Sequence, residues 1–315
     1  KKEAKPVVHK VRKVPNLMLQ MLGEELEKLH KTGVIEEIES SEWLAPIVLV
    51  PKDGGRKIRM CVDLRDLNKH IWVDRQPLPN ITEVLTTLKK ATMFSVIDLS
   101  SDYHQVILHD ESRHLTSFVT PLGAYRYKRM PFGLATAAAC FQRVMLHVLK
   151  DIPRVLVFQD DVLVSGENRE EHDAILMRVL GKMEEAGLTV REDKCKFRVS
   201  SVTYLGHTIT KEGISPKFEL ARSITEAPQP ENKDQVRSFL GLAEYCARFI
   251  QNFAEISAPL RSLLRKGEKF VWSQECAQAV TKIKDCISIM PTLGQFDTRK
   301  KTYLSTDASL LGLGA

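Results

Sequence analysis

The sequence has few features of a secreted or membrane protein. Its six cysteines form no C-x-x-C pair and are scattered through apolar stretches, which argues against both a zinc site and a disulfide framework. It contains no run of eighteen apolar residues, no charged-then-apolar leader, no internal repeat and no low-complexity segment. We therefore expect reduced thiols and no membrane partner. The expected location is cytoplasmic or nuclear, and we expect no secretion.

The sequence has enough apolar residues to form a substantial core. Its 315 residues are 43% hydrophobic and 27% charged, which predicts a globular chain of two or three domains. The formal net charge of +6 permits a polyanionic partner without requiring one.

Two adjacent carboxylates, Asp160 and Asp161, stand between short apolar runs at 155–158 and 162–164. The β-branched residues of these runs predict two strands, and the polar break predicts a hairpin. Two like charges side by side favour a compensating cation, and a pair of divalent metal ions is one candidate. A solvated acidic turn is the alternative.

A third carboxylate, Asp98, ends the apolar stretch 93–98. It is either a helix cap before Ser100-Ser101-Asp102 or a third metal ligand. A basic hairpin is predicted from 45–52 and 57–63, with Lys52 and Arg59 near its tip. This tip is either a solvated turn or a clamp for a triphosphate.

The remaining elements alternate irregularly, which predicts an α+β fold and not a repeated βαβ sheet. The apolar spacing predicts helices over 17–29, 134–148, 175–183, 236–253 and 276–287, and strands over 106–108, 202–207 and 302–307.

Several separate blocks occur in an order that is specific to one family. They are Arg59-Met60-Cys61-Val62-Asp63, Leu67-Asn68-Lys69, Pro77-Leu78-Pro79, Asp98-Leu99, Tyr103-His104-Gln105, Arg129-Met130-Pro131-Phe132-Gly133-Leu134, Phe141-Gln142-Arg143, Asp160-Asp161, Leu205-Gly206-His207, Arg237-Ser238-Phe239-Leu240-Gly241-Leu242 and Thr306-Asp307-Ala308-Ser309. Over nearly its whole length the chain resembles the reverse transcriptase of gypsy-type LTR retrotransposons, which is part of a Pol polyprotein.

The resemblance implies a right-hand polymerase with fingers, palm and thumb, followed by a connection and an RNase H-like domain. We expect fingers and palm at 1–213 and the thumb at 214–266. The connection and the beginning of the RNase H-like domain are expected at 267–315.

The resemblance also implies the reaction. Asp98, Asp160 and Asp161 would be the catalytic carboxylates that hold two Mg²⁺ ions, with Mn²⁺ as a substitute. The implied enzyme is an RNA-directed DNA polymerase that adds nucleotides from dNTPs to a primer 3′-hydroxyl on an RNA or DNA template. Its implied partners are an RNA template, a DNA primer or product and the RNA–DNA hybrid.

Substrate-binding roles follow from the same resemblance. Lys52 and Arg59 would grip the β- and γ-phosphates, and Lys194 would protonate pyrophosphate. Tyr103 would be the steric gate that excludes a ribose 2′-hydroxyl. Phe132 and Gly133 would line the nucleotide pocket.

Two further sites are implied towards the end of the chain. Leu205, Gly206 and His207 would form the primer grip. Asp307 would be the first metal ligand of RNase H, and we expect that activity to belong to a longer parent protein. The chain departs from the family pattern at Phe158, where tyrosine is usual, and at Asp102, where glycine or alanine is usual.

Two alternatives stay open. An RNA-dependent RNA polymerase shares the metal-carboxylate palm, although the aromatic Tyr103 favours deoxynucleotides. A decayed or domesticated element that only binds nucleic acid is the non-enzymatic alternative. The sequence carries no signal for an oligomeric state.

Overall fold

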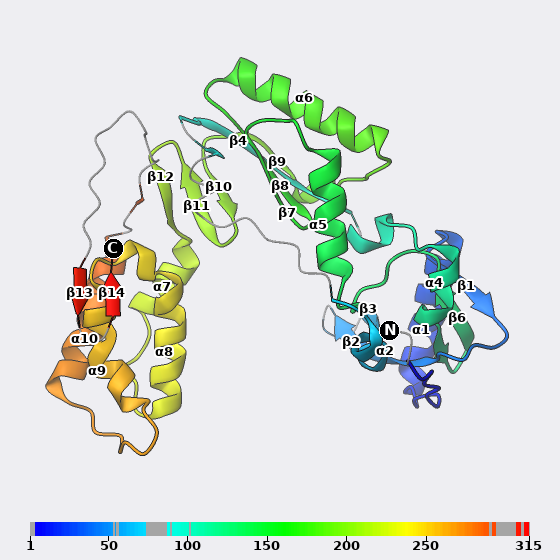
Figure 1. The fold of residues 1–315 in the computed structure, drawn as a ribbon, viewed down its shortest axis with the longest axis horizontal. Coiled ribbons are helices and arrows are strands. Elements are labelled where there is room, and N and C mark those ends of the chain that lie inside the picture. The colour runs from blue at the N-terminus through cyan, green and yellow to red at the C-terminus, as the bar shows by residue number, and fades with distance from the viewer. Residues whose placement is uncertain are drawn as a thin grey trace.

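The computed structural model describes residues 4–52, 54, 57–73, 87–88, 90–100, 102–289, 292–293, 307–309 and 312–314. The motif at 77–79 and the predicted strand residues 302–306 lie outside these ranges. In Figure 1 a central sheet lies between an N-terminal block and a group of C-terminal helices.

The N-terminal block is built on a five-stranded sheet with the order β1-β6-β5-β2-β3. Leu22, Leu26 and Leu29 on one helix are buried against this sheet, as their helical spacing predicts. The strands are β1 (Ile35–Ile38), β2 (Ala45–Lys52), β3 (Lys57–Val62), β5 (Phe118–Thr120) and β6 (Gly123–Tyr127), and the helices are α1 (Asn16–Lys31), α2 (Arg65–His70) and α4 (Asp110–Arg113).

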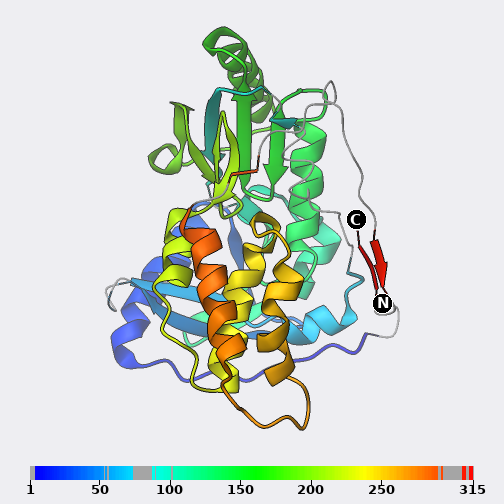
Figure 2. The same cartoon turned by 90° about the vertical axis from the view of Figure 1, so that its left-hand side faces the viewer.

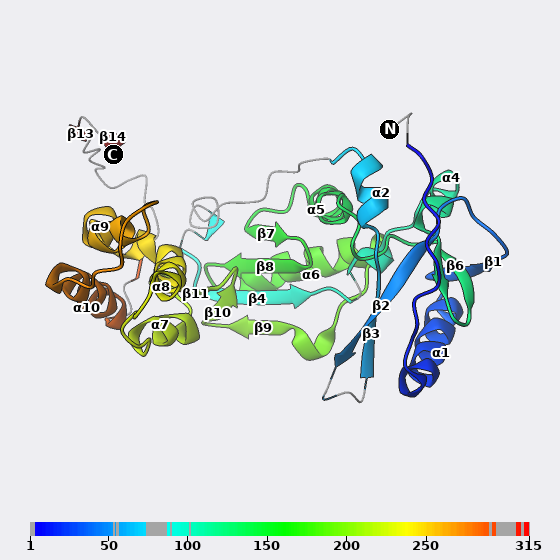
Figure 3. The ribbon, with the colours of Figure 1, turned by 90° about the horizontal axis from the view of Figure 1, so that it is seen from below.

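The central sheet is antiparallel, with the order β7-β8-β4-β9. Two long helices pack against one face of this sheet, and Figure 3 shows the sheet between the C-terminal helices and the N-terminal strands. The elements are β4 (Met93–Asp98), β7 (Val155–Phe158), β8 (Asp161–Gly166), β9 (Lys196–Val199), α5 (Ala137–Val148) and α6 (Arg169–Glu185).

Alternation along the central strands separates two cores. Ile97 and Val162 pack with the residues of α5 and α6, whereas Phe94 and Leu163 pack with the C-terminal elements. Successive side chains of a strand point to opposite faces. Asp98 and Asp161 therefore lie on the same face as Phe94 and Leu163, opposite to α5 and α6.

The C-terminal elements follow the central sheet. A three-stranded sheet, β10-β11-β12, shares one core with four helices. Figure 2 shows these helices side by side, seen from their end of the molecule. The elements are β10 (Val202–Tyr204), β11 (His207–Thr210), β12 (Gly213–Pro216), α7 (Phe218–Thr225), α8 (Lys233–Tyr245), α9 (Phe253–Leu263) and α10 (Gln274–Ser288). A small antiparallel pair, β13 (Asp307–Ser309) and β14 (Gly312–Gly314), comes last.

Three sequence predictions were wrong. Residues 106–108 form no strand, because Ile107 makes only an isolated bridge to Arg129. Residues 202–207 are not one strand, because Leu205 and Gly206, with φ of 48° and 74°, form the turn between β10 and β11. Residues 236–253 are not one helix.

The break in that last helix has a backbone cause. α8 ends at Tyr245, a single 3₁₀ turn covers Ala247–Phe249, and Asn252 adopts a left-handed φ of 56° before α9 begins. The side chains on both sides of the break face one core, so the apolar spacing continues across it. Spacing alone therefore could not predict the interruption.

Among the described residues, no helix is long and apolar enough to span a membrane.

Candidate active site

Two carboxylates meet at one end of the central sheet. Asp98 is the last residue of β4 and Asp161 is the first residue of β8, and the two are directly opposite each other in the antiparallel register. Side chains opposite each other on neighbouring strands lie on the same face with their Cβ atoms about 5 Å apart. The Asp160 carbonyl oxygen accepts a hydrogen bond from the Leu99 N–H at 3.2 Å. The three predicted aspartates thus belong to one junction.

The turn that carries Asp160 and Asp161 has a strained first residue. Phe158 and Asp161 close the β7–β8 hairpin, so Gln159 and Asp160 form a two-residue loop. Gln159 has a φ of 55°, a left-handed conformation that favours glycine. The predicted hairpin is confirmed, but its tip uses a glutamine where a short turn usually has glycine or asparagine.

A buried glutamine from the Phe141-Gln142-Arg143 block, for which no role was predicted, holds this turn. Gln142 on α5 is fully buried. Its Nε2 donates to the Val157 carbonyl oxygen at 2.9 Å, and its Oε1 accepts from the Gln159 N–H at 2.6 Å. Gln142 therefore fixes the hairpin on both sides of Phe158.

Lys194 lies beside the carboxylate junction. Its Nζ is 3.7 Å from Asp98 Oδ2, and the Asp98 side chain is only 18% exposed. Tyr204 on β10 donates a hydrogen bond to the Asp161 carbonyl oxygen at 3.3 Å. Burial, followed by the nearby Asp161 charge, raises the pKa of Tyr204, so this phenol keeps its proton and remains a donor.

Tyr103 stands in an aromatic group on the segment after β4. Its ring lies 5.0 Å from that of Phe132 and meets Phe141 edge-on at 5.8 Å. His104 packs edge-on against Phe132 at 5.1 Å. Burial, together with the charges of Arg129 and Lys28, lowers the pKa of His104 to about 4. This aromatic group therefore carries no imidazolium charge at neutral pH.

Gln105 ties the same segment to the loop after α6. Its Nε2 donates to the carbonyl oxygens of Ser100 and Thr189, and its Oε1 accepts from the Thr189 N–H at 2.8 Å. Ser100 and Gln105 lie on either side of Tyr103, so these bonds hold the backbone both before and after it.

The predicted basic residues of the N-terminal block share one face of the β2–β3 hairpin. Lys52 is opposite Lys57, and Arg59 is opposite Val50, so the three cations alternate onto the same side. All three are exposed. Figure 3 shows that the end of β4 which carries Asp98 points towards β2 and β3.

The predicted primer-grip residues form the β10–β11 turn. Tyr245 on α8 donates a hydrogen bond to the Leu205 carbonyl oxygen, and its hydroxyl fills the space that a Cβ at Gly206 would need. His207 is buried and stacks on Tyr245 with ring centroids 5.0 Å apart. Burial, followed by the Arg248 charge, lowers the pKa of His207 to about 4. The turn is thus fixed to α8, and His207 serves as a packing residue within it.

The side chains of Asp307 and Asp102 lie outside the described part of the structure. Asp307 is the first residue of β13.

A divalent ion fits the chemistry of the carboxylate junction. Across the described ranges, no group of three His, Cys, Asp or Glu side chains is arranged to hold a metal ion by itself. Mg²⁺ is commonly held by one or two carboxylates together with substrate phosphates, and not by protein ligands alone. The opposed Asp98 and Asp161, with Asp160 in the adjoining turn, provide that kind of donor set.

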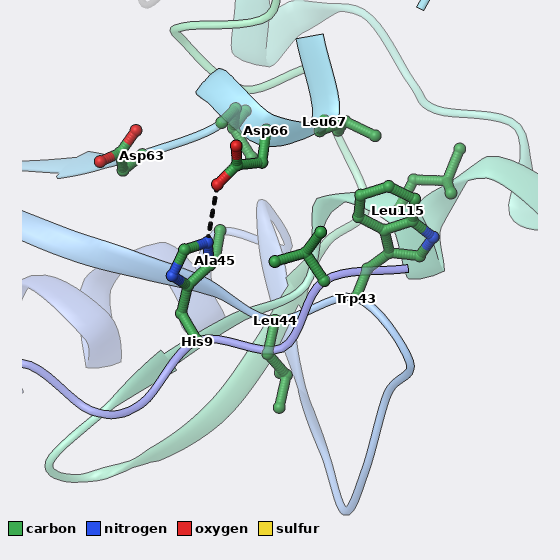
Figure 4. A pocket seen from close by; sticks show the side chains of 10 residues that line it. His9, Trp43, Leu44, Ala45, Asp63, Asp66, Leu67 and Leu115 are labelled. Carbon is green, nitrogen blue, oxygen red and sulfur yellow. Dashed lines mark hydrogen bonds and ion pairs between the residues drawn. The ribbon is translucent and has the colours of Figure 1, made fainter. Parts of the chain in front are cut away.

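A small pocket lies elsewhere, in the N-terminal block (Figure 4). There His9 Nε2 is 2.9 Å from Asp66 Oδ2. Hydrogen bonds from Arg65 and Arg12 hold the pKa of the nearby Asp63 well below its usual range. These contacts attach the N-terminal segment to α2, and none of the predicted site residues lines this pocket.

Comparison with known protein families matches two parts of the chain. The model described as "Reverse transcriptase (RNA-dependent DNA polymerase)" matches residues 50–209, about half of the chain. The model described as "RNase H-like domain found in reverse transcriptase" matches residues 272–315. The first match includes the three aspartates, Tyr103 and Lys194.

Individual relatives are transposon polyproteins. The chain is 35% identical over 322 residues to the retrovirus-related Pol polyprotein from transposon 412 of Drosophila melanogaster, covering 100% of this chain and 26% of that protein. It is 33% identical over 304 residues to the Tf2-3 transposon polyprotein of Schizosaccharomyces pombe, covering 96% of this chain and 23% of that protein. The chain spans about a quarter of the length of these relatives.

Solved structures share the fold. The foamy viral protease-reverse transcriptase in complex with dsDNA superposes with a TM-score of 0.82 and 28% identity, over 93% of this chain and 62% of that chain. The same viral protein in complex with an RNA/DNA hybrid gives a TM-score of 0.77 and 27% identity, over 93% of this chain and 40% of that chain. The predicted polymerase fold is confirmed by these matches.

Proposed function

Because the chain belongs to the reverse transcriptase family, we propose that it is the RNA-directed DNA polymerase of a retrotransposon Pol polyprotein. It transfers nucleotides from dNTPs to a primer 3′-hydroxyl on an RNA or DNA template. The observation that carries the proposal is the β4–β8 register, in which Asp98 and Asp161 are opposed next to the Lys194 ammonium.

Asp98, Asp160 and Asp161 would hold two Mg²⁺ ions, or Mn²⁺ in their place. When bound, such ions activate the primer hydroxyl for in-line attack on the α-phosphate and neutralise the charge of the departing pyrophosphate. The protein's own contribution is positioning, because Gln142 and the sheet register fix the backbone on which the carboxylates stand.

Cationic side chains would handle the triphosphate. Lys194, whose Nζ lies 3.7 Å from Asp98 Oδ2, would protonate the departing pyrophosphate. Lys52 and Arg59 share the exposed face of the β2–β3 hairpin, and they would grip the β- and γ-phosphates as charge-assisted donors.

Tyr103 would exclude a ribose 2′-hydroxyl. Its ring is braced by Phe141 on the buried side and by Phe132 on the exposed side. A braced ring cannot swing away from the sugar, so the collision with a 2′-hydroxyl is not relieved. Gly133, next to Phe132, would let the backbone approach the nucleotide.

The nucleic-acid partners would be an RNA template, a DNA primer or product and their hybrid. The solved viral relatives are complexes with dsDNA and with an RNA/DNA hybrid, which supports the same partners here. The β10–β11 turn would grip the primer, and the exposed Arg248 would contact phosphates.

The wider assignment is part of the proposal. The parent protein would belong to a gypsy-type element and carry RNase H activity, with Asp307 as its first metal ligand. It would act in the cytoplasm within a virus-like particle, or in the nucleus. The proposed boundaries are 1–213, 214–266 and 267–315, although α10 packs in one core with α7 and α9.

Primer extension by the 315-residue chain tests the proposal. With Mg²⁺, an RNA template and a DNA primer, we expect dNTPs to extend the primer and rNTPs to extend it far more slowly. Extension that prefers rNTPs would support an RNA-dependent RNA polymerase. Binding of the duplex without any extension would support a protein that only binds nucleic acid.

A further inference from the structure

A side-chain amide on α2 binds the loop that carries Phe132. Asn68 Nδ2 donates to the Gly133 carbonyl oxygen at 2.8 Å, and Asn68 Oδ1 accepts from the Ala135 N–H at 2.9 Å. The two bonds enclose Leu134 as the peptide group of a neighbouring strand would. They therefore fix both the position and the orientation of the loop.

Helix α2, which carries Asn68, is fixed to the N-terminal core. Leu64 and Leu67 at the start of α2 are buried in the N-terminal core. Just before the helix, Asp63 pairs with Arg65 and with Arg12 at 2.7 Å and 3.0 Å. An anchor on this helix can transmit a fixed position to the loop.

The loop itself lies where two cores meet. Leu134 packs against the core of the central layer and against the N-terminal core. Gly133 adopts a φ of 90°, which an L side chain would rarely accept. Phe132, just before this bend, is 49% exposed, so packing holds its ring only in part.

Phe132 connects the loop to Tyr103. The two rings lie 5.0 Å apart, and the ring of Phe141 also contacts Tyr103. Phe141 is fully buried whereas Phe132 is half exposed, so of these two rings Phe132 is the one that can shift more easily. A shift of the loop would widen the space around the Tyr103 ring.

We infer that Asn68 is a positioning residue for sugar selection, because it holds Phe132 against Tyr103 and so keeps the gate ring in place. This inference rests on the proposed polymerase function. Asn68 acts through the loop and makes no contact with the nucleotide itself.

The test compares the incorporation of dNTPs and rNTPs by the wild type, Asn68→Ala, Asn68→Asp and Tyr103→Ala. We expect Asn68→Ala to lower the preference for dNTPs about tenfold, which corresponds to about 1.4 kcal/mol. Asn68→Asp keeps the acceptor for Ala135 but places a carboxylate oxygen against the Gly133 carbonyl oxygen, and the two oxygens repel each other, so its effect should be at least as large. In an Asn68→Ala/Tyr103→Ala double variant, the loss of Asn68 should have no further effect on selectivity.

Lys69→Ala is the matched control. Lys69 lies next to Asn68 on α2 and pairs with Asp66 on the surface, so its loss should leave selectivity unchanged. If the wild type extends primers and Tyr103→Ala raises rNTP use, unchanged selectivity in Asn68→Ala overturns the inference. If the wild type does not extend primers, the proposed function fails instead. Thermal midpoints of all variants separate a fall in selectivity from loss of folding.

Discussion

Gln142 makes its two hydrogen bonds to the hairpin that carries Asp160 and Asp161. Neither bond is strong by itself, since a typical protein hydrogen bond contributes about 1 kcal/mol net. The acceptor on Gln142 is nevertheless paired with the N–H of Gln159, the residue with a left-handed φ. A non-glycine residue in that region costs about 1–2 kcal/mol. The Gln142 amide therefore offsets the strain that gives the turn its shape.

Replacing Gln142 with leucine tests this role. The variant keeps the volume and removes both bonds, so we expect the free energy of unfolding to fall by about 2 kcal/mol. We also expect kcat for dNTP incorporation to fall about tenfold or more, with little change in KM. Denaturant unfolding and steady-state kinetics measure the two effects.

A second substitution separates positioning from general destabilisation. Glycine adopts a positive φ without strain, so Gln159→Gly in the Gln142→Leu background should recover part of the lost kcat. If kcat falls only in proportion to the unfolded fraction, and Gln159→Gly recovers nothing, Gln142 is merely a packing residue.

The apolar runs of the sequence predicted that Asp98 ends one strand and that Asp161 begins another. The role of these carboxylates as metal ligands comes from the family resemblance and stays a prediction, and the residues that position them were not predicted. Asn68 and Gly133 are joined by a bond across 65 positions of the chain, and Gln142 reaches Gln159 from another element. No local pattern encodes such a contact, because it exists only once the elements have packed.

At the scale of elements, the β10–β11 hairpin is fixed to the C-terminal helices through His207. The ring stacks on Tyr245 of α8 and tilts against Phe249 at 5.7 Å. Burial, and to a smaller extent the charge of Arg248, lowers the pKa of His207 to about 4. In the unfolded chain the pKa of histidine is about 6.5.

This difference in pKa predicts how stability depends on pH. Between about pH 6.5 and pH 4 the unfolded chain binds a proton that folded His207 does not, so the free energy of unfolding falls as the pH is lowered through this window. The slope from one such group is about 1.4 kcal/mol per pH unit. His207→Phe keeps the stacked ring and cannot titrate, so its thermal midpoint should fall less steeply across the same window.

The wild type is the reference for that slope, since His104 titrates in the same window in both proteins. Parallel curves of thermal midpoint against pH for the wild type and His207→Phe would contradict the assigned burial of His207.

Elements with a continuous local signal were predicted well. The β7–β8 hairpin, the β2–β3 hairpin and helix α1 all follow from alternation or helical spacing. The β10–β11 turn was not predicted because its first residue is Leu205. Two-residue hairpin turns usually have asparagine or aspartate before the glycine. Its shape depends on the Tyr245 contact from α8, which lies far along the chain.

At the scale of the whole molecule, the candidate site lies where the parts meet. The end of the central sheet that carries the carboxylates points towards the β2–β3 hairpin (Figure 3). Helices α5 and α6 cover the face of the sheet opposite to Asp98 and Asp161. The face with Asp98 and Asp161 continues into the core of β10–β12 and the C-terminal helices. In the proposed polymerase, each part would thus contribute one function: cations, carboxylates or the grip on the primer.

The most direct test of this arrangement compares the wild type with Asp160→Asn in primer extension and duplex binding. The substitution removes one charge from the turn and keeps its volume, so binding of an RNA–DNA duplex should be unchanged. Incorporation of dNTPs with Mg²⁺ should fall about a thousandfold, equivalent to about 4 kcal/mol of transition-state stabilisation. Equal extension by Asp160→Asn and the wild type would contradict the account.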